Sequence, residues 1–152
     1  MKTRKDNYVN ILLVEDNPGD IRLTQEALKE SEIKSNLHVV KDGVEAIDFL
    51  KRKGKYSTFQ TPDIILLDLN LPKKDGREVL AEIKNDEHLK TIPVIILTTS
   101  DADQDIFKSY KLHANCFITK PVDLDQFIYI IRQIQVFWFS VVKLPSSINT
   151  KL

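Results

Sequence analysis

The chain has 152 residues and only one cysteine, Cys116, which lies inside an apolar run. A single cysteine cannot close a disulfide within the chain, so we interpret Cys116 as a small buried hydrophobic residue in a reducing compartment. The three histidines, His38, His88 and His113, are scattered along the sequence. The sequence therefore excludes an internal disulfide framework and offers no cysteine and histidine spacing of the kind that binds zinc.

The chain also lacks an excess of charge of either sign, because 22 lysines and arginines balance 22 aspartates and glutamates. Nothing in this balance attracts the protein to nucleic acid or to an anionic membrane. One basic run covers residues 51–55, and we interpret it as the solvated end of a helix before a loop rather than as a nucleic-acid patch. No nucleic-acid partner is expected.

Long hydrophobic runs are missing as well. The most apolar stretch, 127–142, is too short to span a bilayer comfortably and is interrupted by Arg132, Gln133 and Gln135. The first ten residues are polar and charged, unlike a signal peptide. We expect a soluble cytoplasmic protein with no membrane partner.

Four short apolar runs, rich in branched residues, each stop at a polar side chain. Runs of this kind are typical of parallel strands that are covered on both faces. The runs are 11–14 before Glu15 and Asp16, 64–67 before Asp68, 94–97 before Thr98, and 116–119 before Lys120.

Helical patterns alternate with these strands. We predict helices over about 21–31, 44–50, 77–85 and 103–112, a further strand over 37–40, and a last helix from about residue 124 with Asp123 as its N-cap. Five strands alternating with five helices predict an α/β fold with a doubly wound, five-stranded parallel sheet. Residues 1–7 are expected to form a tail, 8–139 one domain, and 140–152 an irregular C-terminal extension.

The apolar face of each helix follows from the spacing of its hydrophobic residues. Ile21, Ala27 and Leu28 are expected to face the core. The second helix is indicated by Val44, Ile47 and Leu50, and the third has Val79, Leu80 and Ile83 on its apolar side.

In a parallel sheet the carboxyl ends of the strands share one edge, where ligands bind. Glu15, Asp16 and Asp68 would meet at this edge and repel one another unless a cation lies between them. Carboxylate oxygens are hard ligands that suit Mg²⁺, and the backbone carbonyl of Asn70 could supply a further oxygen.

Lys120 and Thr98 complete a site for a phosphoryl group. The ammonium of Lys120 would favour the ionised form of Asp68, and the hydroxyl of Thr98 can donate to an oxyanion. Asp68 would then be a nucleophile that forms an acyl phosphate, with Mg²⁺ and Lys120 neutralising charge on the transferred group. Asp16 or Asp68 alone is equally compatible with a cap or turn, and Thr98 alone is more typical of a strand. The combination at one end of the strands therefore carries the inference.

At these residues the chain resembles the receiver domains of two-component response regulators. The resemblance covers about residues 8–135 and rests on motifs that together are highly specific. These motifs are Leu13-Val14-Glu15-Asp16, Leu67-Asp68-Leu69-Asn70-Leu71-Pro72 with Asp75-Gly76, residues 93–99, and Lys120-Pro121. The resemblance implies a flavodoxin-like fold with strand order 2-1-3-4-5.

The resemblance also implies a role for each matching position. Asp68 matches the phosphoacceptor, and Glu15 with Asp16 matches the acidic pair that binds Mg²⁺. Thr98 and Lys120 match the switch hydroxyl and the family's lysine. Phe117 matches the aromatic switch position, where the family often has tyrosine, so a phenol hydrogen bond is in doubt here and ring burial remains as the signal.

Residues 66–80 are similar to the small single-domain regulators that are paired with cyanobacterial phytochrome kinases. The likeness implies a phosphohistidine on a light-sensing histidine kinase as the donor, and a homodimer joined through the last helix and its extension. Independently, the last helix carries more apolar surface than one face can bury, and folding back onto its own domain is the alternative. The expected interface residues are Tyr129, Phe137, Trp138 and Phe139.

Three rival functions remain. A Mg²⁺-dependent phosphatase with an aspartyl nucleophile needs a second acid two residues later, where this chain has Asn70. A DNA-binding regulator would need a helix-turn-helix after the receiver, and the sequence leaves no room for one. A pseudo-receiver adaptor would bind partners without phosphorylation. We expect a phosphorylation switch that is not a turnover enzyme.

Overall fold

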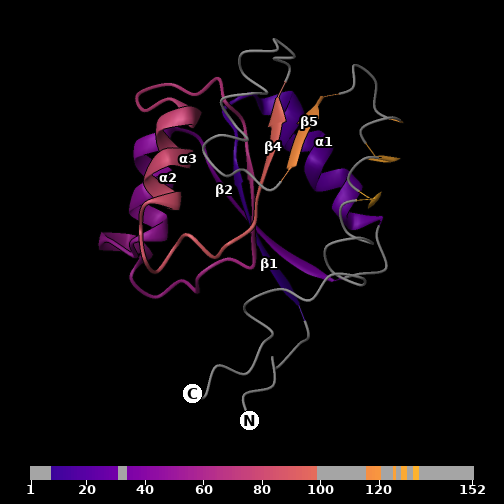
Figure 1. Cartoon of the computed structure of the whole chain (residues 1–152). Coiled ribbons are helices and arrows are strands. Elements are labelled where there is room, and N and C mark those ends of the chain that lie inside the picture. The colour runs from indigo at the N-terminus through magenta and orange to yellow at the C-terminus, as the bar shows by residue number, and fades with distance from the viewer. Residues whose placement is uncertain are drawn as a thin grey trace.

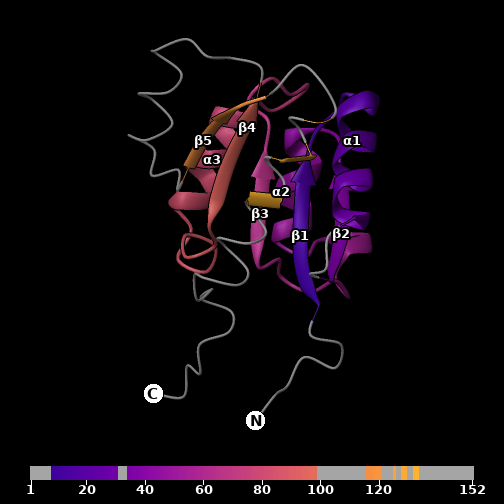
Figure 2. The same cartoon turned by 90° about the vertical axis from the view of Figure 1, so that its right-hand side faces the viewer.

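The computed structural model describes residues 8–30, 34–98 and 116–120 and the single positions 125, 128, 129, 132 and 133. Five strands pair in parallel in the order β2-β1-β3-β4-β5, which Figure 2 shows across one face. The strands are β1 Val9–Val14, β2 Ser35–Val40, β3 Ile64–Leu67, β4 Val94–Thr98 and β5 Cys116–Thr119. The predicted doubly wound parallel sheet and its strand order are confirmed.

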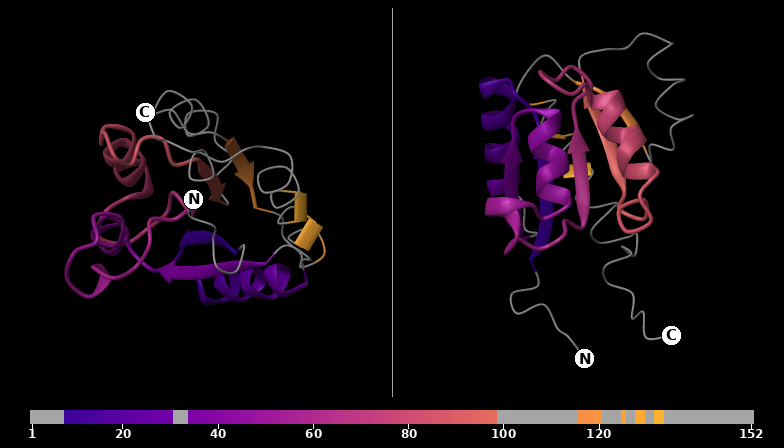
Figure 3. Two further views of the ribbon diagram at one scale, coloured as in Figure 1. Left: turned by 90° about the horizontal axis from the view of Figure 1, so that it is seen from below. Right: turned by 90° about the vertical axis from the view of Figure 1, so that its left-hand side faces the viewer.

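In the continuous described segments, three helices cover the two faces of this sheet. They are α1 Pro18–Lys29, α2 Gly43–Leu50 and α3 Gly76–Lys84, and a 3₁₀ turn, η1, spans Gly54–Tyr56. Helices α2 and α3 lie on one face and α1 on the other, as Figures 1 and 3 show from different directions. The predicted helix over 103–112 and the cap Asp123 lie outside the described residues. In the part of the chain that is described, no helix has the length and hydropathy needed to cross a membrane.

Each strand contributes to two hydrophobic clusters because successive side chains point to opposite faces. Leu12 and Val14 pack with α2 and α3, whereas Ile11 and Leu13 pack with α1. Both faces of the central strands are therefore buried, which explains why these strands have continuous apolar sequences rather than alternating ones. Ile128, in the last helix, packs against the cluster on the α1 side.

Helix α1 begins three residues earlier than predicted. We predicted a start at about residue 21, but Asn17 is the N-cap and accepts a hydrogen bond from the backbone N–H of Asp20, with Pro18 at the first helical position. Proline suits that position because its missing N–H would have had no intrahelical partner. The shift matters because it places Asp20 in the first turn of the helix.

Val44, one of the three apolar residues that indicated α2 in the sequence, does not face the core. Its side chain is 45% exposed, whereas α2 buries Ala46, Ile47, Phe49 and Leu50. The first turn of α2 is oriented by Gly43, where an added Cβ would lie 2.0 Å from the backbone oxygen of Lys74. Since Gly43 faces the loop before α3, the next residue along the helix turns toward solvent.

The loop between α2 and β3 is held by a cluster of four rings. His38, Phe49, Tyr56 and Phe59 lie with ring centroids 4.5–5.9 Å apart. Tyr56 is buried and its hydroxyl donates to Glu45. The basic run 51–55 is exposed directly after the end of α2, as expected for a solvated helix end.

The residues that follow β3 pack closely against the first residue of α3. Asp75 caps this helix in a capping box with Glu78, and the backbone N–H of Gly76 donates to the carbonyl of Leu69 at 3.0 Å. A Cβ at Gly76 would lie 2.2 Å from the backbone oxygen of Asp68 and 2.6 Å from the Cα of Leu69. Glycine at this position therefore allows the strand end that carries Asp68 to approach α3.

We expect Gly76→Ala to lower the free energy of unfolding by roughly 2–3 kcal/mol, because the methyl group overlaps backbone atoms that cannot move independently. Urea unfolding followed by circular dichroism measures the change. Gly19→Ala is the matched control, since its Cβ would meet the side-chain oxygen of Asn17 at 3.2 Å and this cap can adjust. Equal effects of the two substitutions would contradict the argument.

Candidate functional site

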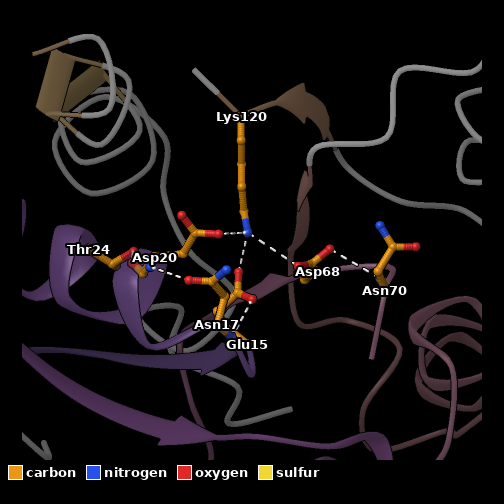
Figure 4. Close-up of polar contacts among 7 residues, drawn as sticks. All are labelled: Glu15, Asn17, Asp20, Thr24, Asp68, Asn70 and Lys120. Carbon is orange, nitrogen blue, oxygen red and sulfur yellow. Dashed lines mark hydrogen bonds and ion pairs between the residues drawn. The ribbon is translucent and has the colours of Figure 1, made fainter. Parts of the chain in front are cut away.

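The polar residues that follow the strands meet at the carboxyl edge of the sheet. Glu15 and Asp16 follow β1, Asp68 follows β3, and Lys120 follows β5, while Thr98 is the last residue of β4. Figure 4 shows the side chains of Glu15, Asp68 and Lys120 converging from these separate elements. The site thus gathers residues that lie more than 100 positions apart in the sequence.

Three carboxylates form the acidic part of the site. Glu15, Asp16 and Asp68 each offer one oxygen, and these oxygens lie within 4.8 Å of one another. Glu15 and Asp68 are buried and Asp16 is exposed. The sharp turn after β1 allows both neighbours to reach the edge, and the N–H of Asn17 donates to Glu15 there at 3.1 Å. This set of hard oxygen donors fits Mg²⁺ or a similar divalent cation.

Lys120 is the cationic part of the site. Its ammonium donates to Glu15, to Asp68 at 3.2 Å and to Asp20 at 2.8 Å. The side chain is only 3% exposed, and its backbone N–H donates to the carbonyl of Thr98 at 2.7 Å. Three carboxylates therefore occupy the three N–H donors of one buried ammonium.

The surroundings of Asp68 favour its ionised form. Burial by itself would raise the pKa of Asp68, but a hydrogen bond from the Thr98 side chain, the charge of Lys120 and the N–H of Asn70 outweigh it and lower the pKa below its ordinary value. The Asp68 carboxylate is thus charged at neutral pH and lies 7% exposed at the edge of the sheet. An ionised carboxylate is the form that can act as a nucleophile.

Glu15 and Lys120 respond to burial in opposite ways. Burial raises the pKa of Glu15 to about 7, because the hydrogen bond from Lys120 offsets only part of the cost of burying a charge next to Asp68. Burial would lower the pKa of Lys120, but its hydrogen bonds to Asp20 and Glu15 raise that pKa to about 12. Lys120 is therefore a permanent charge, and the ionisation of Glu15 depends on a nearby cation.

The predicted switch residues lie beside this cluster. Thr98 is fully buried at the end of β4, and Phe117 is partly buried against the cluster on the α2 and α3 side. In the register of the sheet Thr98 pairs with Thr119, and Ile96 pairs with Phe117. Thr98 and Phe117 thus lie on adjacent strands, and the Thr98 side chain bonds to Asp68.

Other predicted positions are only partly described. The backbone N–H of Asn70 bonds to Asp68, and a metal-binding role for its carbonyl stays a prediction. Tyr129 is 61% exposed in the last helix, whereas Phe137, Trp138 and Phe139 lie outside the described residues.

Our sequence reasoning missed Asp20, which contacts Lys120. The signal was an acid four residues after Asp16, just past an asparagine that can cap a helix. It was overlooked because the predicted helix began at residue 21, one position after Asp20.

Comparison with known proteins agrees with this geometry. Residues 11–132 match the family model described as "Response regulator receiver domain". The response regulator Rcp1 of Synechocystis sp. is 50% identical over 137 residues, which cover 90% of this chain and 93% of that protein.

Two solved structures are similar over nearly their whole length. The crystal structure of the phosphorylated cyanobacterial phytochrome response regulator RcpA is 54% identical, with a TM-score of 0.88 over 91% of this chain and 99% of that one. The Mn²⁺-bound form of Rcp1 is 50% identical, with a TM-score of 0.86 over 90% and 99% of the two chains. The chain therefore belongs to the response regulator receiver domain family.

Proposed function

We propose that this protein is the phosphoryl-accepting response regulator of a two-component phosphorelay and that Asp68 is its phosphoacceptor. The observation that carries the proposal is the environment of Asp68. Its carboxylate is held ionised beside a buried ammonium and shares the edge of the sheet with two further acids. Few other reactions use a charged carboxylate, a lysine and a cluster of hard oxygen ligands together.

The reaction we propose is transfer from a phosphohistidine. A carboxylate oxygen of Asp68 attacks phosphorus, the phosphorus–nitrogen bond of the donor breaks, and the imidazole leaves with the electron pair of that bond. The product is an acyl phosphate on Asp68. Lys120 and the Thr98 hydroxyl are close enough to Asp68 to donate to the oxygens of the transferred group.

Glu15, Asp16 and Asp68, with the backbone carbonyl of Asn70, would hold the Mg²⁺ ion. Bound there, the ion would supply positive charge to the phosphoryl oxygens during transfer. Receiver domains bind Mg²⁺ or Mn²⁺ in such an acidic pocket, and the Mn²⁺-bound form of Rcp1 supports this assignment.

Phosphorylation would act as a switch by adding charge and acceptor oxygens beside Thr98. The Thr98 hydroxyl moves toward the new oxygens, and the ring of Phe117 packs into the space that is released. Partner binding then follows as a population shift between two arrangements of the β4 and β5 edge.

The donor we infer is a histidine kinase, and specifically a phytochrome in the cytoplasm. The support is similarity, since RcpA is described as a cyanobacterial phytochrome response regulator. The phosphatase alternative is disfavoured because Asn70 occupies the position of the required general acid. A pseudo-receiver would keep the fold without accepting phosphate.

We expect Asp68→Asn to abolish uptake of a phosphoryl group, because an amide cannot form the acyl phosphate. The protein is incubated with acetyl phosphate and Mg²⁺, and intact mass is measured at successive times. Asp86→Asn, in the connection after α3, is the control and should be labelled like the wild type. Labelling of the Asp68→Asn protein would sink the assignment of the nucleophile, and no labelling of the wild type by acetyl phosphate or by a phosphorylated phytochrome kinase would favour the pseudo-receiver.

Mg²⁺ should raise the melting temperature, because it relieves repulsion among the three acids. A Mg²⁺ concentration one hundred times the dissociation constant raises the free energy of unfolding by about 2.7 kcal/mol. Asp16→Asn should weaken Mg²⁺ binding by roughly tenfold or more, since one of few charged ligands is lost. Asp16 is chosen because it is exposed, so the substitution itself disturbs packing little. Thermal unfolding across a Mg²⁺ titration measures both effects, and an unchanged titration for Asp16→Asn would contradict the proposed ligand set.

We further propose a homodimer formed through the last helix, in which Tyr129 is an anchor. Its side chain is 61% exposed, and exposed aromatic residues are frequent interface anchors. Tyr129→Glu should raise the dissociation constant of the dimer at least about tenfold. Sedimentation measures this change as a shift from dimer toward monomer. Gln25→Glu, exposed on α1, adds the same charge and should leave the distribution unchanged. A wild-type protein that sediments as a monomer at all concentrations would refute the dimer.

A further inference from the structure

Asp20 holds a fixed place beside the ammonium of Lys120. Its backbone N–H bonds to the side chain of Asn17 at 3.1 Å, and its carbonyl accepts from the Thr24 hydroxyl at 2.9 Å. The carboxylate, 25% exposed, reaches Lys120 at 2.8 Å. Figure 4 shows Asp20 and Asp68 on opposite sides of the ammonium, with Glu15 between them. The position of Asp20 is therefore set by the start of α1 and not by the metal ligands.

The three donors of the Lys120 ammonium are fully used. A phosphoryl oxygen on Asp68 can bond to this ammonium only if one of the present carboxylates gives up its place or shares a donor. The lysine side chain is 3% exposed, so it has little freedom to turn toward a new acceptor. Asp20 and a phosphoryl group are therefore competitors for the same cation.

Charge adds to this competition. Phosphorylation replaces the single charge of Asp68 by about −1.5 to −2. The carboxylate oxygens of Glu15, Asp16 and Asp68 lie close enough together to share a divalent cation. Asp20 does not belong to this set of candidate metal ligands. Its negative charge consequently remains next to the phosphoryl group and repels it.

We propose that Asp20 is a positioning residue that limits how tightly the site holds a phosphoryl group, by retaining the Lys120 ammonium and by repelling the added charge. The inference rests on the proposed function of Asp68 and adds a residue that determines the balance between the free and phosphoryl-bound states. Asp20→Asn keeps the shape and the acceptor oxygen of the side chain and removes only its charge.

The test uses beryllofluoride, a phosphoryl analogue, with the full-length protein at saturating Mg²⁺. Isothermal titration calorimetry should show binding roughly three- to tenfold tighter for Asp20→Asn than for the wild type, as expected for loss of one partly screened charge. The difference should shrink as salt is raised. Glu26→Gln on the same helix removes an equal charge from an exposed side chain that pairs with Lys29 instead of Lys120, and it should bind like the wild type.

A purely structural role predicts a different result. Asp20 is an acid in the first turn of α1, where its negative charge also interacts favourably with the helix dipole. If that were its only role, Asp20→Asn would lower the melting temperature and leave beryllofluoride affinity unchanged or weaker. If the wild type binds beryllofluoride, an unchanged or weaker affinity of Asp20→Asn would overturn the inference and leave the proposed function standing. Absence of binding to the wild type would overturn both.

Discussion

The ammonium of Lys120 holds together carboxylates that arrive from the end of β1, the end of β3 and the first turn of α1. Buried acids this close would otherwise repel one another or take up protons. The lysine itself is fixed through its backbone bond to Thr98. One cation thereby links three segments of the fold and keeps Asp68 charged, and the chemistry of the site depends on this arrangement.

The hydrophobic core explains why the ammonium is needed. Because both faces of the central strands are covered, the strand ends carry their polar residues into a partly buried edge. Burial raises the pKa of Glu15 to about 7, and it would do the same to Asp68 without Thr98, Lys120 and the N–H of Asn70. The close approach at Gly76 holds the strand end that carries Asp68 against α3. Packing and electrostatics at this edge are therefore coupled, and a change in either alters the environment of the Asp68 carboxylate.

The similarity to Rcp1 and RcpA gives this geometry a family context. The match extends over nearly the whole of both relatives, and it includes the strand ends at which the acids and the lysine lie. Asp20 is distinct in the way it contributes. It belongs to the first turn of a helix rather than to a strand end, so its influence on Lys120 can vary without altering the acids that would hold a metal. Such a position is suited to adjusting the strength of a switch while the reaction stays the same.

The sequence by itself determined the parallel sheet and the edge at which the site lies, because strand periodicity and the polar residue after each apolar run are local features. It also indicated the buried faces of α1 and α3, because apolar residues such as Ala27 and Leu80 follow helical spacing there. Only the tertiary structure decided that Val44 faces solvent, since that depends on how Gly43 meets Lys74. The contact between Asp20 and Lys120 was likewise undetermined. It joins residues 100 positions apart, and such a pairing follows from how the first turn of a helix packs beside a distant strand rather than from any local pattern.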